Sequence, residues 1–147
     1  MIKNSLRAFV NRALEHKHIS AEDVKELRRD ILRDGLSSRE EADALVALDR
    51  AAVPADGSWA EFLVETIVEF AVWTSRPTGY IDRSTAAWLV ATLSAGAGPT
   101  ATAIRIAFEI VREAETVDET LLAFVMRGAK HRSRGGETVA EPERVAA

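Results

Sequence analysis

The sequence predicts an all-α fold: a single-domain orthogonal bundle of six or seven helices, built of helical hairpins around a central apolar helix at about residues 58–74. Apolar residues recur at helical spacing, capping residues precede most apolar stripes, and no segment alternates as a β-strand does. At 147 residues, 47% of them hydrophobic, the chain is long enough to bury one core. We expect the folded domain to span 1–128 and the aperiodic segment 129–147 to be a disordered tail.

The first half of the chain predicts three helices. Ser20 is placed to cap the second helix, and Gly35 is placed to end it. Ser37 with Glu40 forms a capping box, which predicts the start of the third helix. The inward-facing residues of the first two helices are Leu6, Phe9, Val10, Ala13, Leu14, Val24, Leu27 and Ile31.

The second half predicts the central helix and three more. Ser58 with Glu61 forms a second capping box, and the apolar residues that follow cover more than half of the helix circumference. Asp82 is the expected N-cap of the next helix. A sixth apolar stripe predicts a sixth helix, and a short seventh helix ending near Arg127 completes the domain. The sixth stripe consists of Ala103, Ile104, Ala107, Phe108 and Val111.

Composition excludes several classes of protein. The chain has no cysteine, which excludes disulfides, thiolate metal sites and cysteine nucleophiles. It has no run of 18 apolar residues, so no membrane-spanning helix is expected. Polar residues interrupt the N-terminal apolar pattern, so we expect no signal peptide and a cytoplasmic location.

Charge is unevenly distributed. The net charge is −4 at pH 7, and residues 53–128 carry ten acidic groups against five arginines. Such a surface repels phosphate backbones, so nucleic acid is not expected to bind the folded body. The basic segment KHRSR at 130–134 is expected to be a solvated part of the tail.

The segment DILRDGLSSREE is the strongest candidate for a metal site. It matches four positions of a calcium-binding EF-hand loop, which are Asp30, Asp34, Gly35 and Glu41. Leu32 stands at the third position, where a ligand is required, and the apolar stripe through Ile31 indicates that the helix continues into the loop. Capping and helix termination therefore explain most of the pattern. Asp34, Glu40 and Glu41 remain as candidate ligands for calcium or another divalent cation.

The same segment resembles a known family. Its DGLSSREE part is similar to the D-G-apolar-[ST]-x-x-E signature of the TerB-like domains, known from tellurite-resistance proteins, through Asp34, Gly35, Leu36, Ser37 and Glu40 or Glu41. The resemblance implies an all-helical fold of hairpins over about residues 20–126, divalent-metal binding through acidic residues, and a role in stress-response or membrane-associated assemblies. A metal site of this kind would need carboxylates from both halves of the chain. The glycine loops PTGYID and SAGAGPTAT in the second half have few acids, so the chain differs from the family's pattern there.

Three carboxylates four residues apart, Glu61, Glu65 and Glu69, lie on one line of the central helix. A metal-dependent enzyme would need Glu-x-x-His pairs on other helices, and the three histidines do not have that spacing. We therefore interpret the three glutamates as the solvated edge of the helix and keep a metal-dependent enzyme as the alternative.

Three tryptophans, Trp59, Trp73 and Trp88, flank the loops at the ends of the central helix. They are candidates for core packing or for exposed anchors of a partner. The sequence therefore favours a non-enzymatic interaction or regulatory module of TerB-like type, with a protein partner or self-association and with possible weak metal binding. A helical adaptor or homodimer without ligand is the remaining alternative.

Overall fold

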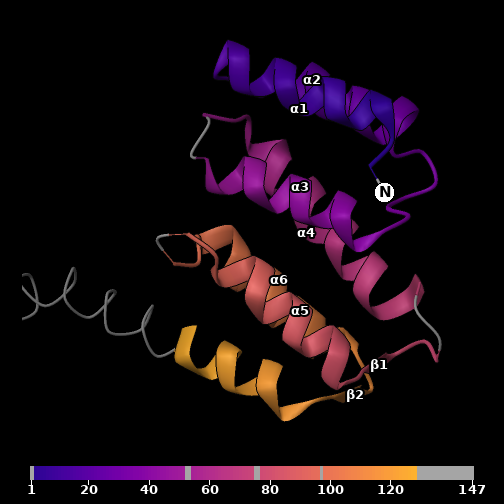
Figure 1. The fold of residues 1–147 in the computed structure, drawn as a ribbon, viewed down its shortest axis with the longest axis vertical. Coiled ribbons are helices and arrows are strands. Elements are labelled where there is room, and N and C mark those ends of the chain that lie inside the picture. The colour runs from indigo at the N-terminus through magenta and orange to yellow at the C-terminus, as the bar shows by residue number, and fades with distance from the viewer. Residues whose placement is uncertain (1, 52–53, 75–76, 97, 129–147) are drawn as a thin grey trace, which may run out of the picture.

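The computed structural model describes residues 2–51, 54–74, 77–96 and 98–128, and these residues form an all-α fold (Figure 1). The predicted fold class is confirmed, whereas the predicted tail at 129–147 lies outside the described residues. Two α-helices run on directly as π-helices. The helices are α1 (Asn4–His16), α2 (Ala21–Glu26) with its extension η1 (Leu27–Ile31), α3 (Arg39–Arg50), α4 (Gly57–Val68) with its extension η2 (Glu69–Thr74), α5 (Arg83–Ser94), α6 (Ala101–Glu113) and a final helix at 119–128.

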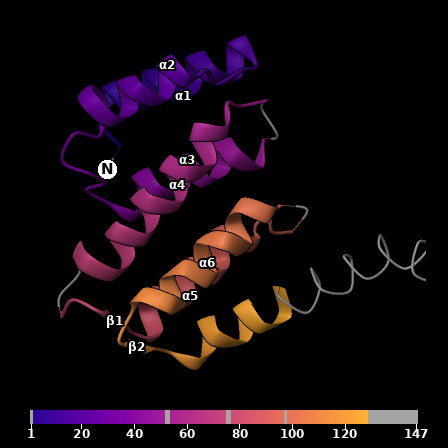
Figure 2. The same ribbon diagram turned by 180° about the vertical axis from the view of Figure 1, so that it is seen from behind.

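The helices form hairpins that are stacked in two layers. In one layer α1 contacts α3 and α3 contacts α5; in the other, α2 contacts α4 and α4 contacts α6 (Figures 1 and 2). The contact between α4 and α6 is the most extensive. The helix at 119–128 lies beyond α5 and α6 and contributes Leu121 and Phe124 to the core.

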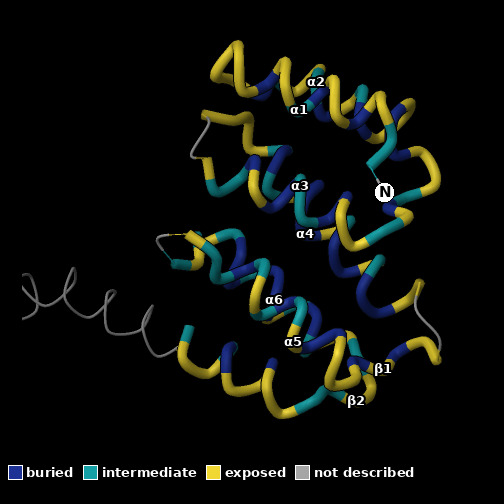
Figure 3. Tube along the Cα trace, viewed as in Figure 1, coloured by how far each residue is buried: buried dark blue, intermediate teal, exposed yellow. Residues whose placement is uncertain are grey.

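Burial follows the predicted apolar stripes (Figure 3). The central helix buries one broad face and exposes the edge that carries its three glutamates, as predicted. Leu14 and Phe108 differ from the prediction, because 43% and 48% of these side chains, respectively, are exposed. The buried face of α6 includes Ile106 and Ile110, and Phe108 lies two residues from each, on the opposite side of the helix.

Helix starts agree with the predicted caps at two positions. Ser20 accepts the backbone N–H of Asp23 at 3.1 Å, and the Asp23 carboxylate accepts the N–H of Ser20 in return. Asp82 accepts the N–H of Thr85 at 2.8 Å at the start of α5. Gly35 was predicted to end the second helix, but η1 ends earlier, at Ile31 with Leu32 as its C-cap; Gly35 has φ +84° in the turn that follows, where its N–H donates to the Leu32 carbonyl at 3.0 Å.

Two other helix starts were predicted at the wrong residue. The N-cap of α3 is Ser38, one residue later than predicted, and its hydroxyl accepts the N–H of Glu41. The N-cap of α4 is Asp56, which accepts the N–H of Ser58 at 3.0 Å and so places Ser58 inside the helix. In each case a second capping residue beside the predicted one satisfies the free N–H groups of the first turn.

A short parallel pairing was not predicted. Strand β1 (Tyr80–Ile81) pairs with β2 (Thr116–Val117), so the loop after η2 lies beside the end of α6. Two-residue strands are too short to give an alternating pattern. Within the described part of the chain, no helix combines the length and the apolar composition that crossing a bilayer requires.

Candidate functional site

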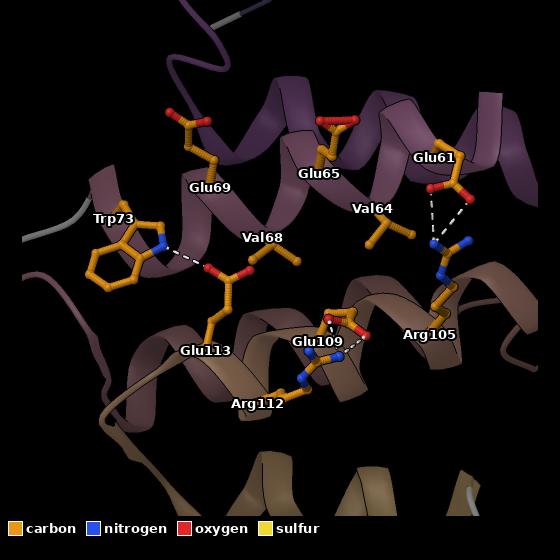
Figure 4. Close-up of a pocket in the computed structure, with 10 residues that line it drawn as sticks. All are labelled: Glu61, Val64, Glu65, Val68, Glu69, Trp73, Arg105, Glu109, Arg112 and Glu113. Carbon is orange, nitrogen blue, oxygen red and sulfur yellow. Dashed lines mark hydrogen bonds and ion pairs between the residues drawn. The ribbon is translucent and has the colours of Figure 1, made fainter. Parts of the chain in front are cut away.

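A large groove among the described residues lies between α4 and α6, on the layer formed by the even-numbered helices (Figure 4). It has a volume of about 720 Å³. Its walls carry five glutamates and two arginines, and apolar side chains lie between the two helices. The lining residues are Glu61, Val64, Glu65, Val68, Glu69, Trp73, Arg105, Glu109, Arg112 and Glu113.

Helix periodicity produces the two acidic walls. Glu61, Glu65 and Glu69 lie four apart along α4 and η2, and four-residue spacing places side chains on one face of a helix. Glu109 and Glu113 have the same spacing on α6. Packing of α6 against α4 brings these two lines to opposite sides of one groove.

Each end of the groove carries a bridge between the helices (Figure 4). At one end the guanidinium of Arg105 donates to both carboxylate oxygens of Glu61, each at 3.1 Å. At the other end the indole N–H of Trp73 donates to Glu113 at 2.9 Å. The Arg105 hydrogen bond and its charge lower the pKa of Glu61, so this carboxylate is ionised at neutral pH.

Between these bridges the carboxylates outnumber the cations. Glu69 makes no ion pair with the other described residues, and Glu109 pairs only with Arg112 of its own helix, at 3.4 Å. Over the ten lining residues, five carboxylates face two guanidiniums, an excess of three negative charges. Val64 and Val68, both nearly fully buried, form an apolar floor. The arrangement suits a ligand that is cationic at several points and has an apolar stem.

A second groove adjoins the first across the ridge of Glu65 and Glu69, which line both. It has a volume of about 330 Å³ and lies between the end of η1 with the loop 32–36 on one side and α4 with η2 on the other. Arg28 of η1 crosses it, pairs with Glu65 at 3.3 Å and stacks over the Phe62 ring at 5.3 Å. The layer formed by α2, α4 and α6 therefore presents a continuous hollowed surface with glutamates along its middle.

The three predicted metal ligands are not brought together. Asp34 lines the groove between η1 and η2, whereas Glu40 lines a different one between α3 and α5. Glu41 is fully buried and its oxygens are already occupied. No three His, Asp or Glu side chains in the described ranges are close enough to hold one ion.

Glu41 instead joins three segments of the backbone. It accepts the N–H of Ser37 at 3.0 Å, the hydroxyl of Ser37 at 2.8 Å and the N–H of Lys3 at 3.1 Å. Burial raises the pKa of Glu41, but the hydrogen bonds from Ser37 and Lys3 outweigh it, so the pKa lies below its ordinary value. The sequence pattern that suggested a metal ligand is therefore that of a structural carboxylate.

Of the three tryptophans, only Trp73 is an exposed aromatic. Trp59 is 3% exposed and donates its indole N–H to Asp49 at 3.2 Å. Trp88 is half-buried; it donates to Asp43 at 2.8 Å and meets the Phe70 ring edge-on. Trp73 is 47% exposed at the mouth of the α4–α6 groove.

The sequence identified one wall of this groove, the glutamate line on the central helix, but not the opposite one. Glu109, Glu113 and Arg105 become part of the same surface only when α6 packs on α4. Comparison of the chain with protein-family models, with curated proteins and with solved structures gives no match.

Proposed function

We propose that this protein is a non-enzymatic interaction module that binds a cationic segment of a partner protein in the α4–α6 groove. The observation that carries the proposal is the excess of carboxylates along both walls of this groove, with the exposed Trp73 at its mouth. The proposal retains the interaction module that the TerB-like resemblance implies and assigns its binding surface to the even-numbered helices.

The dimensions of the groove suit a short peptide. Glu61 and Trp73 are twelve residues apart, which corresponds to about 18 Å at 1.5 Å per residue. An extended chain rises about 3.3 Å per residue, so five or six residues span the groove. Stacked helical hairpins commonly use such elongated surfaces to bind partners.

Each feature of the groove has a counterpart on a lysine- or arginine-rich peptide. Ammonium and guanidinium groups form charge-assisted hydrogen bonds with carboxylates such as Glu65 and Glu69. The methylene stems of these side chains can pack on the valine floor. The exposed face of Trp73 is a site for a cation over an aromatic ring.

The same charges disfavour self-association through this face. In a two-fold symmetric dimer the surface meets its own copy, so two acidic grooves would face each other. Like charges in contact oppose association. A cationic partner is therefore a better occupant than a second copy of the folded domain.

The proposal is tested by titrating the protein with fluorescein-labelled hexa-arginine and measuring anisotropy. We expect saturable binding that weakens as salt rises from 50 to 500 mM, because salt screens exposed charges. The Glu65→Gln/Glu69→Gln variant removes two carboxylates that make no bridge to α6. We expect it to bind about ten-fold more weakly, since an exposed ion pair contributes up to about 1 kcal/mol.

The matched control is Glu15→Gln/Glu22→Gln, which removes the same charge from the exposed surface of the α1–α2 hairpin. If both double variants weaken binding equally, the peptide responds to net charge only and the groove is not its site. Labelled hexa-glutamate should not bind, and a complex with it would contradict the proposal.

A further inference from the structure

The last described residue, Gly128, packs against the beginning of α6, on the side of that helix that faces a cavity with α5. Gly128 packs on the first turn of α6 so closely that a methyl group in place of its hydrogen would lie 3.2 Å from Ile104. The next residue of α6 is Arg105, which bridges to Glu61 at one end of the groove. Adjacent residues of an α-helix are about 100° apart around the helix axis. Gly128 therefore contacts α6 on a side about a quarter turn away from the side that faces the groove.

The sequence that follows has the charge that the groove lacks. Lys130, Arg132 and Arg134 lie within five residues, together with His131 and with no acid among them. Their three positive charges complement the acidic lining of the groove, in which five carboxylates face Arg105 and Arg112, and Glu65 also pairs with Arg28.

The length of the connection is sufficient. At up to about 3.5 Å per residue, the two residues from Gly128 to Lys130 have a maximum length of about 7 Å, and the six residues to Arg134 have one of about 21 Å. The groove begins at the bridge between Arg105 and Glu61 and extends about 18 Å to Trp73. Residues 130–134 can therefore cross α6 and reach the carboxylates near Glu65 and Glu69.

We propose that residues 130–134 occupy the α4–α6 groove of their own chain and compete there with the cationic segment of a partner. This inference rests on the proposed function, because both concern the same groove. A short tether gives an effective concentration in the millimolar range, so even a millimolar affinity keeps the groove substantially occupied. A partner binds only by displacing this segment, which sets a threshold for its affinity.

Competition is tested with the full chain and the hexa-arginine probe. The Lys130→Gln/Arg132→Gln/Arg134→Gln variant removes the competing charges and leaves the groove unchanged. We expect it to bind the probe at least three-fold more tightly than the wild-type chain does. Equal affinities overturn the inference while leaving the proposed function intact, whereas absence of binding to both chains overturns the proposed function.

A cross-linking experiment decides the inference without any probe. The chain has no cysteine, so Arg112→Cys and Ser133→Cys supply the only two thiols, one in the groove wall and one in the basic segment. A short bismaleimide should link them within one chain, detected by mass spectrometry as a cross-linked monomer. Adding the Lys130, Arg132 and Arg134 substitutions should reduce this product several-fold.

The matched control pairs Ser133→Cys with Ala91→Cys. Ala91 is exposed on α5, and its neighbours Val90 and Ser94 on that helix line the cavity beside Gly128, so the tether reaches this position too. The Arg112→Cys/Ser133→Cys pair should cross-link more than the Ala91→Cys/Ser133→Cys pair. Equal cross-linking at both positions, or a product that is mainly dimeric, contradicts occupancy of the groove by the same chain.

Discussion

The carboxylate of Glu41 accepts the backbone N–H of Lys3 at 3.1 Å and so joins the segment before α1 to the first turn of α3, 38 residues away. The same side chain satisfies the N–H and the hydroxyl of Ser37. Glu41 is fully buried, and every hydrogen bond it makes has a backbone or hydroxyl donor. These contacts make it the most informative single residue for the stability of the N-terminal half.

Glu41→Ala should destabilise the fold by about 1–3 kcal/mol, because it leaves the partly buried N–H groups of Ser37 and Lys3 without their acceptor. Glu41→Gln should cost less, since its amide oxygen can still accept from one of them. The measurement is urea denaturation followed by circular dichroism. Glu15→Ala, on the exposed face of α1, should change the free energy of unfolding by less than about 0.5 kcal/mol.

The stability that Glu41 contributes should depend on pH. Its folded-state pKa lies below the ordinary value of 4.5, so its contribution is complete above that value and is lost as pH falls through the folded pKa. We expect the difference in unfolding free energy between the wild-type chain and Glu41→Gln to be constant from pH 7 to 5. It should shrink below pH 4.5, and a difference that grows on acidification would contradict the direction of the pKa shift.

Gly35 and Gly57 form a matched pair. Gly35 has φ +84°, whereas Gly57 opens α4 with no positive φ, and a methyl group at either would meet no atom within 4 Å. Gly35→Ala should therefore cost about 1 kcal/mol through backbone strain alone. Gly57→Ala should be neutral or stabilising by up to about 1 kcal/mol. Thermal denaturation of both variants separates backbone strain from packing. Equal losses of stability in the two variants would argue against backbone strain at Gly35.

Two tryptophans should respond oppositely to truncation. Trp59→Ala should cost about 3–5 kcal/mol, because it leaves a cavity in the core and removes the hydrogen bond from the indole to one oxygen of Asp49. Trp73→Ala should cost less than about 1 kcal/mol, since the side chain is half exposed, but should weaken binding of hexa-arginine several-fold. Anisotropy measured on the folded Trp73 variant tests this. Unchanged affinity would remove Trp73 from the binding surface.

Calcium and magnesium should neither stabilise the protein nor release heat at 1 mM. The reason is that Asp34, Glu40 and Glu41 are separated in the fold, and Glu41 already accepts three hydrogen bonds. Calorimetry of the wild-type chain beside Asp34→Ala/Glu41→Ala is the measurement. A heat signal lost only in the double variant would restore the metal site.

The spacing of apolar residues was sufficient to predict the helices, because burial of one face repeats every three or four residues. It could not choose between Ser37 and Ser38 as the cap of α3, since the segment SSREE fits a capping box in both registers. The choice depends on Glu41 reaching Lys3, a contact between distant parts of the chain.

The candidate site was predicted only in part for the same reason. The glutamate line on α4 is visible in the sequence as a four-residue repeat, but its partner line around Glu109 and Glu113 lies on α6. Which tryptophan is exposed also depends on packing: the core and Asp49 enclose Trp59, whereas Trp73 lies at the end of η2. A repeat in the sequence indicates one face of one helix, whereas this groove is formed by two helices that are distant in the sequence.

Stacking of hairpins also has a consequence for how the molecule opens. The α1–α2 hairpin lies at one end of the stack, where α1 packs on α3 and α2 packs on α4, so it is held from one side rather than surrounded. Disruption of such a stack can proceed stepwise from its ends. Amide hydrogens in α1 should therefore exchange with solvent sooner than those in α4, which would leave the α4–α6 groove formed while the N-terminal hairpin is transiently detached.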